Sequence, residues 1–160
     1  MSMRRFWLMA FFLASVNLST ARECINSEIL PAKIIVANET VDSYQLAYEF
    51  LQRAAIDDET GESHFYMAVL EHRLRLENRA LASLQESAGR DYHFAHAFFR
   101  YAYEEEFMGV RRDLAKSNTH SKKFKESMAA CSEFLKFENP DVVAKSLLLK
   151  LFSIYNVHNK

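Results

Sequence analysis

The chain has 160 residues, of which 49% are hydrophobic, so it can form a single domain with a sizeable core. It holds 20 lysines and arginines against 21 aspartates and glutamates, with the two signs interspersed. This balance argues against a nucleic-acid-binding surface and against a polybasic membrane-binding face. With only 3 glycines and 2 prolines, the chain lacks the turn residues of a β-sandwich or barrel, which favours an all-α fold.

The first 21 residues have the pattern of a signal peptide. Arg4 and Arg5 form a short positive region, an apolar run follows at 6–16, and small residues up to Ala21 stand where an exported precursor is cut. The run is shorter than the roughly 20 apolar residues that a membrane-spanning helix needs. We therefore expect cleavage near Ala21, export to the periplasm or out of the cell, and no stable membrane insertion of the mature chain.

Two cysteines, Cys24 and Cys131, remain after that cleavage. In an oxidising compartment they can form a disulfide that closes a long loop and stabilises the fold by about 4 kcal/mol. The alternative is two separate thiols, because sequence spacing does not show whether the two Cα atoms come within bonding distance. The sequence leaves both states open.

Helical periodicity follows a lead-in segment at 22–41. Within the lead-in, the apolar run at 32–38 fits either a short strand or a helix with Pro31 in its first turn. From residue 41, apolar side chains recur at three- and four-residue steps and predict a first helix. The next helices are predicted at 62–76, at 77–88 with Gly89 as a C-terminal stop, and at 92–107 with Asp91 as N-cap.

The predicted helices repeat in pairs. A pattern of small and apolar residues returns after 33 residues, so that Ala47, Leu51 and Ala55 correspond to Ala80, Leu84 and Ala88. A period of this length is typical of stacked helix-turn-helix units. Small residues at these positions let the facing helix approach closely. We therefore predict a short solenoid of antiparallel helical hairpins at 42–117.

These residues resemble the Sel-one-like repeat family of tetratricopeptide-type helical hairpins. Besides the alanines above, the resemblance rests on Phe99, Tyr103 and the closing run from Gly109 to Asp113. The chain departs from the family at 73–76, where Arg-Leu-Arg-Leu stands in place of Gly-x-Gly-Val. We expect these helix formers to extend the helix there. The resemblance implies protein interaction and complex assembly rather than catalysis.

The hairpin pattern ends after residue 117. A polar break is predicted at 118–121, an amphipathic stretch follows at 122–137, and Pro140 is expected to begin a last helix that runs through Ile154. We predict that the segment 118–160 forms C-terminal helices that shield the open end of the stack, as short repeat arrays require.

We find no pattern of residues for a catalytic, cofactor or metal site. His93 and His96 lie on one predicted helix face, but the chain has neither a His-Glu-x-x-His motif nor clustered cysteine ligands, so we expect no metal. No serine stands in a nucleophile-elbow context, and the few glycines argue against a phosphate-binding loop. We therefore expect no enzyme activity and no cofactor.

The aromatic-rich helix at 92–107 is the strongest candidate for a binding surface. Its aromatic residues cover more than one face, so we expect some to be buried and others to line a groove for a protein or peptide. We assign the surface to Phe98, Arg100, Tyr101 and Tyr103. The favoured hypothesis is an exported, non-catalytic adaptor. The alternative is an effector, immunity-type or enzyme-modulating protein of the cell envelope.

Overall fold

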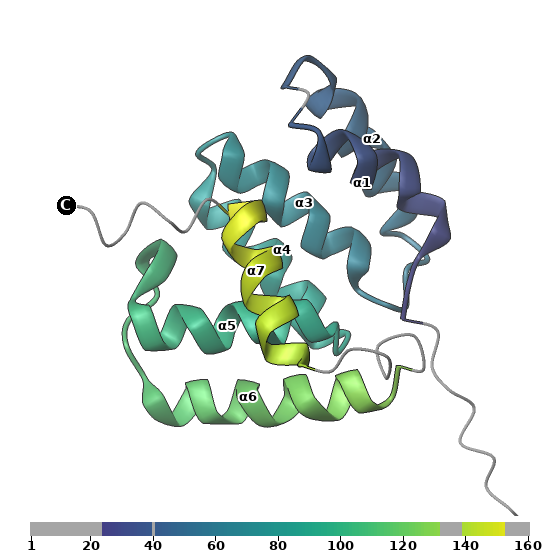
Figure 1. Cartoon of the computed structure of the whole chain (residues 1–160). Coiled ribbons are helices and arrows are strands. Elements are labelled where there is room, and N and C mark those ends of the chain that lie inside the picture. The colour runs from purple at the N-terminus through teal and green to yellow at the C-terminus, as the bar shows by residue number, and fades with distance from the viewer. Residues whose placement is uncertain (1–23, 40, 132–138, 153–160) are drawn as a thin grey trace, which may run out of the picture.

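The computed structural model describes residues 24–39, 41–131 and 139–152 (Figure 1). In these ranges the chain forms seven α-helices and three short 3-10 helices and contains no strand, which confirms the predicted all-α class. The signal peptide predicted at 1–21 and the end of the last predicted helix, at Ile154, lie outside the described residues.

The helices follow one another along the chain with short connections. Their bounds are α1 Leu30–Ala37, α2 Tyr44–Ala54, α3 Glu62–Arg73, α4 Glu77–Gly89, α5 His93–Glu105, α6 Leu114–Ala129 and α7 Pro140–Phe152, and the 3-10 turns are Ser27–Ile29, Val41–Ser43 and Phe107–Gly109.

The lead-in segment contains a helix rather than a strand. Pro31 lies in the first turn of α1, where its missing N–H leaves no helical hydrogen bond unmade. Ala32 and Val36 are four residues apart and fully buried, and α1 packs against α2 and α3. The helix is therefore stabilised by tertiary contacts on one apolar face.

Two helix ends differ from the predicted ones. Helix α3 ends at Arg73, because Arg75 adopts a left-handed conformation (φ 62°) that turns the chain directly into α4, so the expected extension to Leu76 is wrong. Asp91 is also left-handed (φ 57°), and Tyr92 occupies the N-cap position of α5 without a side-chain cap. The prediction that Asp91 caps α5 is therefore wrong.

Helix α6 runs without interruption through the polar break predicted at 118–121. Its N-cap is Asp113, whose carboxylate accepts a hydrogen bond from the backbone N–H of Lys116 at 3.0 Å. Ser117, Phe124 and Met128 are buried at helical spacing, and His120 between them packs on α5, so only the remaining polar residues of this stretch lie on the outer faces. The predicted boundary between repeats and cap, after residue 117, consequently falls inside one helix.

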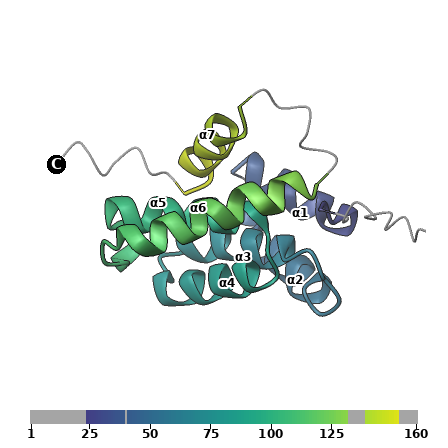
Figure 2. The ribbon, with the colours of Figure 1, turned by 90° about the horizontal axis from the view of Figure 1, so that it is seen from below.

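The packing of the helices differs from the pairs expected from the sequence. We predicted that α2 pairs with α3 and α4 with α5. The most extensive contacts instead join α3 to α4 and α5 to α6, whereas α4 and α5 touch much less (Figure 1). The connection between α3 and α4 spans only residues 74–76, and it holds these two helices side by side. Figure 2 shows α6 lying along α5.

Helix α7 packs across α3 and α5, on one side of the row of helices (Figure 1). Phe152, at its last turn, packs against Phe65 of α3 and Phe98 of α5, with ring centroids 5.8 and 4.9 Å apart. We had expected the C-terminal helices to shield the open end of the stack. Helix α7 covers a side face, which offers aromatic side chains for burial, whereas α6 lies along α5, the last helix of the predicted repeats.

The turn between α2 and α3 rests directly on α4. Gly61 has φ 78°, and a Cβ atom added there would lie 2.8 Å from the backbone oxygen of Ser87. The Ser87 hydroxyl donates a hydrogen bond to the Gly61 carbonyl at 2.7 Å. Gly61 is thus required both for its left-handed backbone and for the close approach of α4.

We expect Gly61→Ala to lower the free energy of unfolding by about 2 kcal/mol, because it adds backbone strain and a steric clash. Gly89→Ala is the matched control. Gly89 is helical and a Cβ there meets nothing within 4 Å, so this change should raise stability by about 0.5 kcal/mol. Urea unfolding followed by circular dichroism measures both. Equal stability of the two variants would show that Gly61 does not constrain the turn.

Candidate functional site

Helix α3 carries a buried carboxylate, Glu62, that joins three parts of the chain. It is 2% exposed and accepts hydrogen bonds from the Asn26 backbone N–H and the Lys33 ammonium, both at 2.7 Å, and from the Tyr92 hydroxyl at 3.2 Å. Burial, and then the negative charge of Glu62, raise the pKa of Tyr92. The hydroxyl therefore stays protonated and donates, and the cluster holds α1 and the start of α5 against α3.

A second buried carboxylate, Glu71, joins α2, α3 and α4. It accepts from the Tyr48 hydroxyl at 2.8 Å and from the Ser83 hydroxyl at 2.6 Å, and the Arg79 guanidinium lies 3.3 Å away. Burial and the hydrogen bond to Glu71 raise the pKa of Tyr48. Because several donors surround each carboxylate in the interior, we assign Glu62 and Glu71 a structural role.

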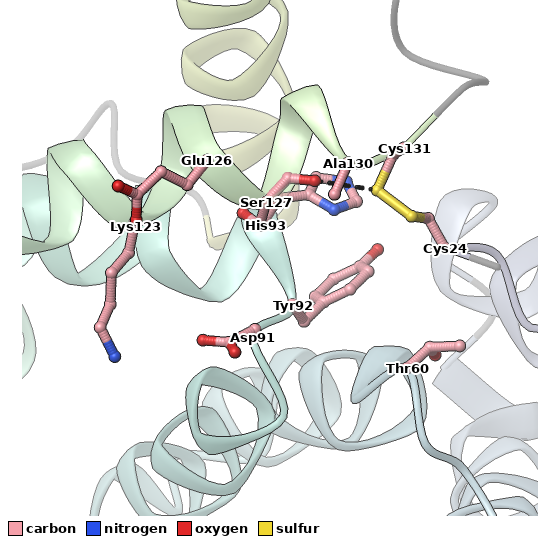
Figure 3. A pocket seen from close by; sticks show the side chains of 10 residues that line it. All are labelled: Cys24, Thr60, Asp91, Tyr92, His93, Lys123, Glu126, Ser127, Ala130 and Cys131. Atoms are coloured by element: carbon pink, nitrogen blue, oxygen red, sulfur yellow. Dashed lines mark hydrogen bonds between the residues drawn. A yellow bond between two sulfur atoms is a disulfide. The ribbon is translucent and has the colours of Figure 1, made fainter. Parts of the chain in front are cut away.

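The disulfide predicted as one of two alternatives is present. Cys24 and Cys131 are bonded, with their Cα atoms 5.8 Å apart, and both are buried. A cleft of about 340 Å³ lies beside the bond, between α6 and the turns that precede α3 and α5 (Figure 3). Lys123 and Glu126 bring opposite charges to its α6 wall, so its electrostatics do not select one class of ligand.

The described part of the chain has no group of three or more His, Cys, Asp or Glu side chains that could hold a metal ion. His93 and His96, the two histidines weighed in the sequence, are both 1% exposed, and His96 contacts His120 and Asp91. Helices that are long and apolar enough to cross a membrane are also absent from the described residues.

Phe98, one of the four residues assigned to a binding surface, is fully buried. Its ring packs against Phe152 at 4.9 Å, Phe99 at 5.6 Å and Phe107 at 5.9 Å between centroids. The prediction that Phe98 contributes to an accessible surface is therefore wrong. The reason is α7, whose last turn lies over this part of α5 and could not be placed there from residue spacing.

Tyr103 lies on the side of α5 that faces α6. Its ring stacks on that of His120 at 5.8 Å, and the Lys116 ammonium lies 5.4 Å from its centroid. It therefore does not share a site with Arg100 and Tyr101, which lie on the side facing α7.

Arg100 and Tyr101 line a groove of about 310 Å³ between α5 and α7. Arg100 is anchored by an ion pair with Asp141 of α7 at 2.5 Å and lies 3.6 Å from Glu104. The groove is also lined by apolar residues of α7, among them Val142, which is 60% exposed. It thus combines charged side chains from both helices, including Lys145 of α7, with apolar contact area on α7.

The α7 wall of this groove could not be predicted from the sequence. Asp141 and Val142 lie in the first turn of a helix 41 residues or more after Arg100, and only the fold brings them together. Oppositely charged residues are so common on helix surfaces that the sequence does not show that Arg100 pairs with Asp141.

Comparisons with models of protein families, with curated protein sequences and with solved structures give no match. The resemblance to Sel-one-like repeats accordingly stays a prediction.

The burial of Phe98 can be tested against the partial exposure of Tyr101 in the same helix. We expect Phe98→Ala to lower the free energy of unfolding by about 4 kcal/mol, because it leaves a cavity under α7. Tyr101→Ala should cost about 1 kcal/mol or less. Chemical unfolding of the two variants measures the difference. Similar losses would mean that α7 does not cover Phe98 in solution.

Proposed function

We propose that the protein is an exported, non-catalytic adaptor that holds another protein or a peptide in the groove between α5 and α7. The supporting observation is that Arg100 and Tyr101 stand side by side in this groove next to apolar residues of α7. Arginine and tyrosine are among the residue types that contribute most energy to protein interfaces. Together they suit a partner with both polar and apolar side chains.

The groove offers an oriented donor group. A guanidinium has five N–H donors. The two acidic neighbours of Arg100, Asp141 and Glu104, hold the guanidinium in place, which lowers the entropy cost of binding a partner through its other N–H groups. Val142 and Leu149 of α7 supply apolar contact area on the other wall. A carbonyl or carboxylate next to an apolar side chain is the chemistry that fits this arrangement.

The disulfide supports the proposed export. Disulfides persist in secreted and periplasmic proteins and are rare in the reducing cytosol. A bond between Cys24 and Cys131 fits the signal-peptide pattern of residues 1–21, because an exported chain folds where such a bond forms.

We further propose that the sequences of α2–α3 and α4–α5 are two divergent Sel-one-like units, even though α4 packs more extensively on α3 than on α5. Corresponding residues of α2 and α4 have the same burial, since Ala47 and Leu51 are as fully buried as Ala80 and Leu84. Left-handed residues also follow the second helix of each unit, at Arg75 after α3 and at Glu106, Met108 and Gly109 after α5. Arg75 occupies a position where the family's pattern has a glycine, and it adopts the left-handed conformation that glycine favours.

Export is tested by producing the whole chain in a secreting host and determining the mass of the recovered protein. We expect an N-terminus at Arg22, after cleavage at Ala21, and no free thiol, because Cys24 and Cys131 are paired. A full-length product with two reactive thiols in the cytosol would contradict the proposal.

The binding groove is tested by placing a photo-crosslinking residue at Val142 in the exporting host. Leu46, on α2, is the matched control, because it is apolar and 55% exposed, close to the 60% of Val142. We expect one defined protein to crosslink at position 142 and not at 46, with a yield that falls several-fold when Tyr101 is changed to alanine. No protein product at 142, or the same products at both positions, would refute the groove as the binding site.

A further inference from the structure

Helix α6 packs along α5 (Figure 2), and two histidines, one from each helix, meet at their interface. The Nδ1 atom of His96, from α5, lies 3.1 Å from the Nδ1 atom of His120, from α6. His96 is 1% exposed. A contact this short between two ring nitrogens requires one to donate and the other to accept.

The surrounding hydrogen bonds determine which of the two Nδ1 atoms donates and which accepts. The Nε2 atom of His96 lies 3.3 Å from the carboxylate of Asp91, which can only accept, so this Nε2 carries the proton. The Nδ1 of a neutral His96 is then an acceptor, and the Nδ1 of His120 donates to it. In this arrangement His96 is neutral, and His120 is neutral when its Nε2 carries no proton.

The other groups around the pair do not favour a positive charge, with one exception. Phe99 and Tyr103 of α5 pack on the His120 ring at 5.1 and 5.8 Å, Lys123 of α6 brings a positive charge close by, and α4 contributes the uncharged Gln85. Asp91 is the negative group beside the pair, and of the two histidines it contacts His96.

These surroundings act on the pKa values of both rings. Burial, then the neighbouring His96 and Lys123, lower the pKa of His120 to about 4. Burial also lowers the pKa of His96, assisted by Lys123 and opposed by Asp91. At neutral pH both rings are therefore uncharged, a state that the hydrogen-bond arrangement allows.

We propose that the His96–His120 pair is a pH-sensitive latch that holds α6 against α5 in neutral solution and releases it in acidic solution. When both rings are protonated, two N–H donors point at each other without an acceptor. Two positive charges are then forced together beside the ammonium of Lys123. Loosening of α6 exposes apolar side chains of the interface, including Phe99 and Phe124, while the disulfide at Cys131 keeps the end of α6 attached.

The direction of the pH effect follows from the lowered pKa values. The unfolded chain, whose histidines titrate near 6.5, takes up protons before the folded chain does as the pH falls. The stability contributed by the pair is therefore fully present above about pH 6.5 and is lost as the pH falls toward the folded value of about 4.

The latch is tested on the disulfide-bonded protein recovered from a secreting host, by chemical unfolding at pH 7.5 and pH 4.5. His120→Gln is the matched variant, since its amide can donate to His96 but does not titrate. We expect the folding equilibrium constant of the wild type to fall at least about tenfold more on acidification than that of the variant. Carboxylates that titrate in this range are common to both proteins and cancel in the comparison.

A second variant and a local measurement keep the test decisive. Lys123 is exposed on α6, so Lys123→Gln should leave stability at pH 7.5 nearly unchanged. The substitution removes the positive charge near the pair, so the folding equilibrium constant should fall less on acidification than in the wild type. Amide hydrogen exchange at pH 7.5 and 5, corrected for the intrinsic rate, should show that the wild type loses protection in α6 before α3 and α4. Equal pH dependence in all three proteins, or unchanged protection of α6, would overturn the proposal.

Discussion

The structure depends on the burial of two carboxylates in α3. A buried, ionised carboxylate is costly unless hydrogen-bond donors surround it, so Glu62 and Glu71 constrain where their partners can lie. Lys33 of α1 and Tyr92 before α5 must reach Glu62, and Ser83 of α4 must reach Glu71. Helix α3 is therefore the element around which α1, α2, α4 and α5 are placed. This also explains why most of its faces are buried.

The sequence predicted well what depends on local patterns and on covalent chemistry. The all-α class follows from helical periodicity and the scarcity of turn residues. One of the two states left open for Cys24 and Cys131 is the disulfide that the structure contains. Ala47 and Ala80, two of the small positions of the predicted repeat, are buried as expected. Small side chains at these positions let neighbouring helices approach closely.

The sequence predicted poorly what depends on contacts between distant segments. Arg75 takes a left-handed turn that its helix propensity opposes, since the packing of α3 on α4 determines the connection. The polar residues at 118–121 continue a helix because the buried stripe of α6 lies on either side of them. The sequence pattern alone could not show that Phe98 is buried and Tyr101 is partly exposed. The burial of Phe98 comes from α7, which begins some forty residues later in the chain.

The bond between Cys24 and Cys131 determines which part of the chain carries a pulling force. A force applied to the chain's two ends would pass through the sulfur atoms and bypass the segment between the cysteines, which are 107 positions apart and enclose α1 to α6. Helix α7 is the described helix outside this span. Under tension it would be pulled away first, and one wall of the groove at Arg100 would go with it. Any molecule bound across α5 and α7 would therefore add resistance to such a load.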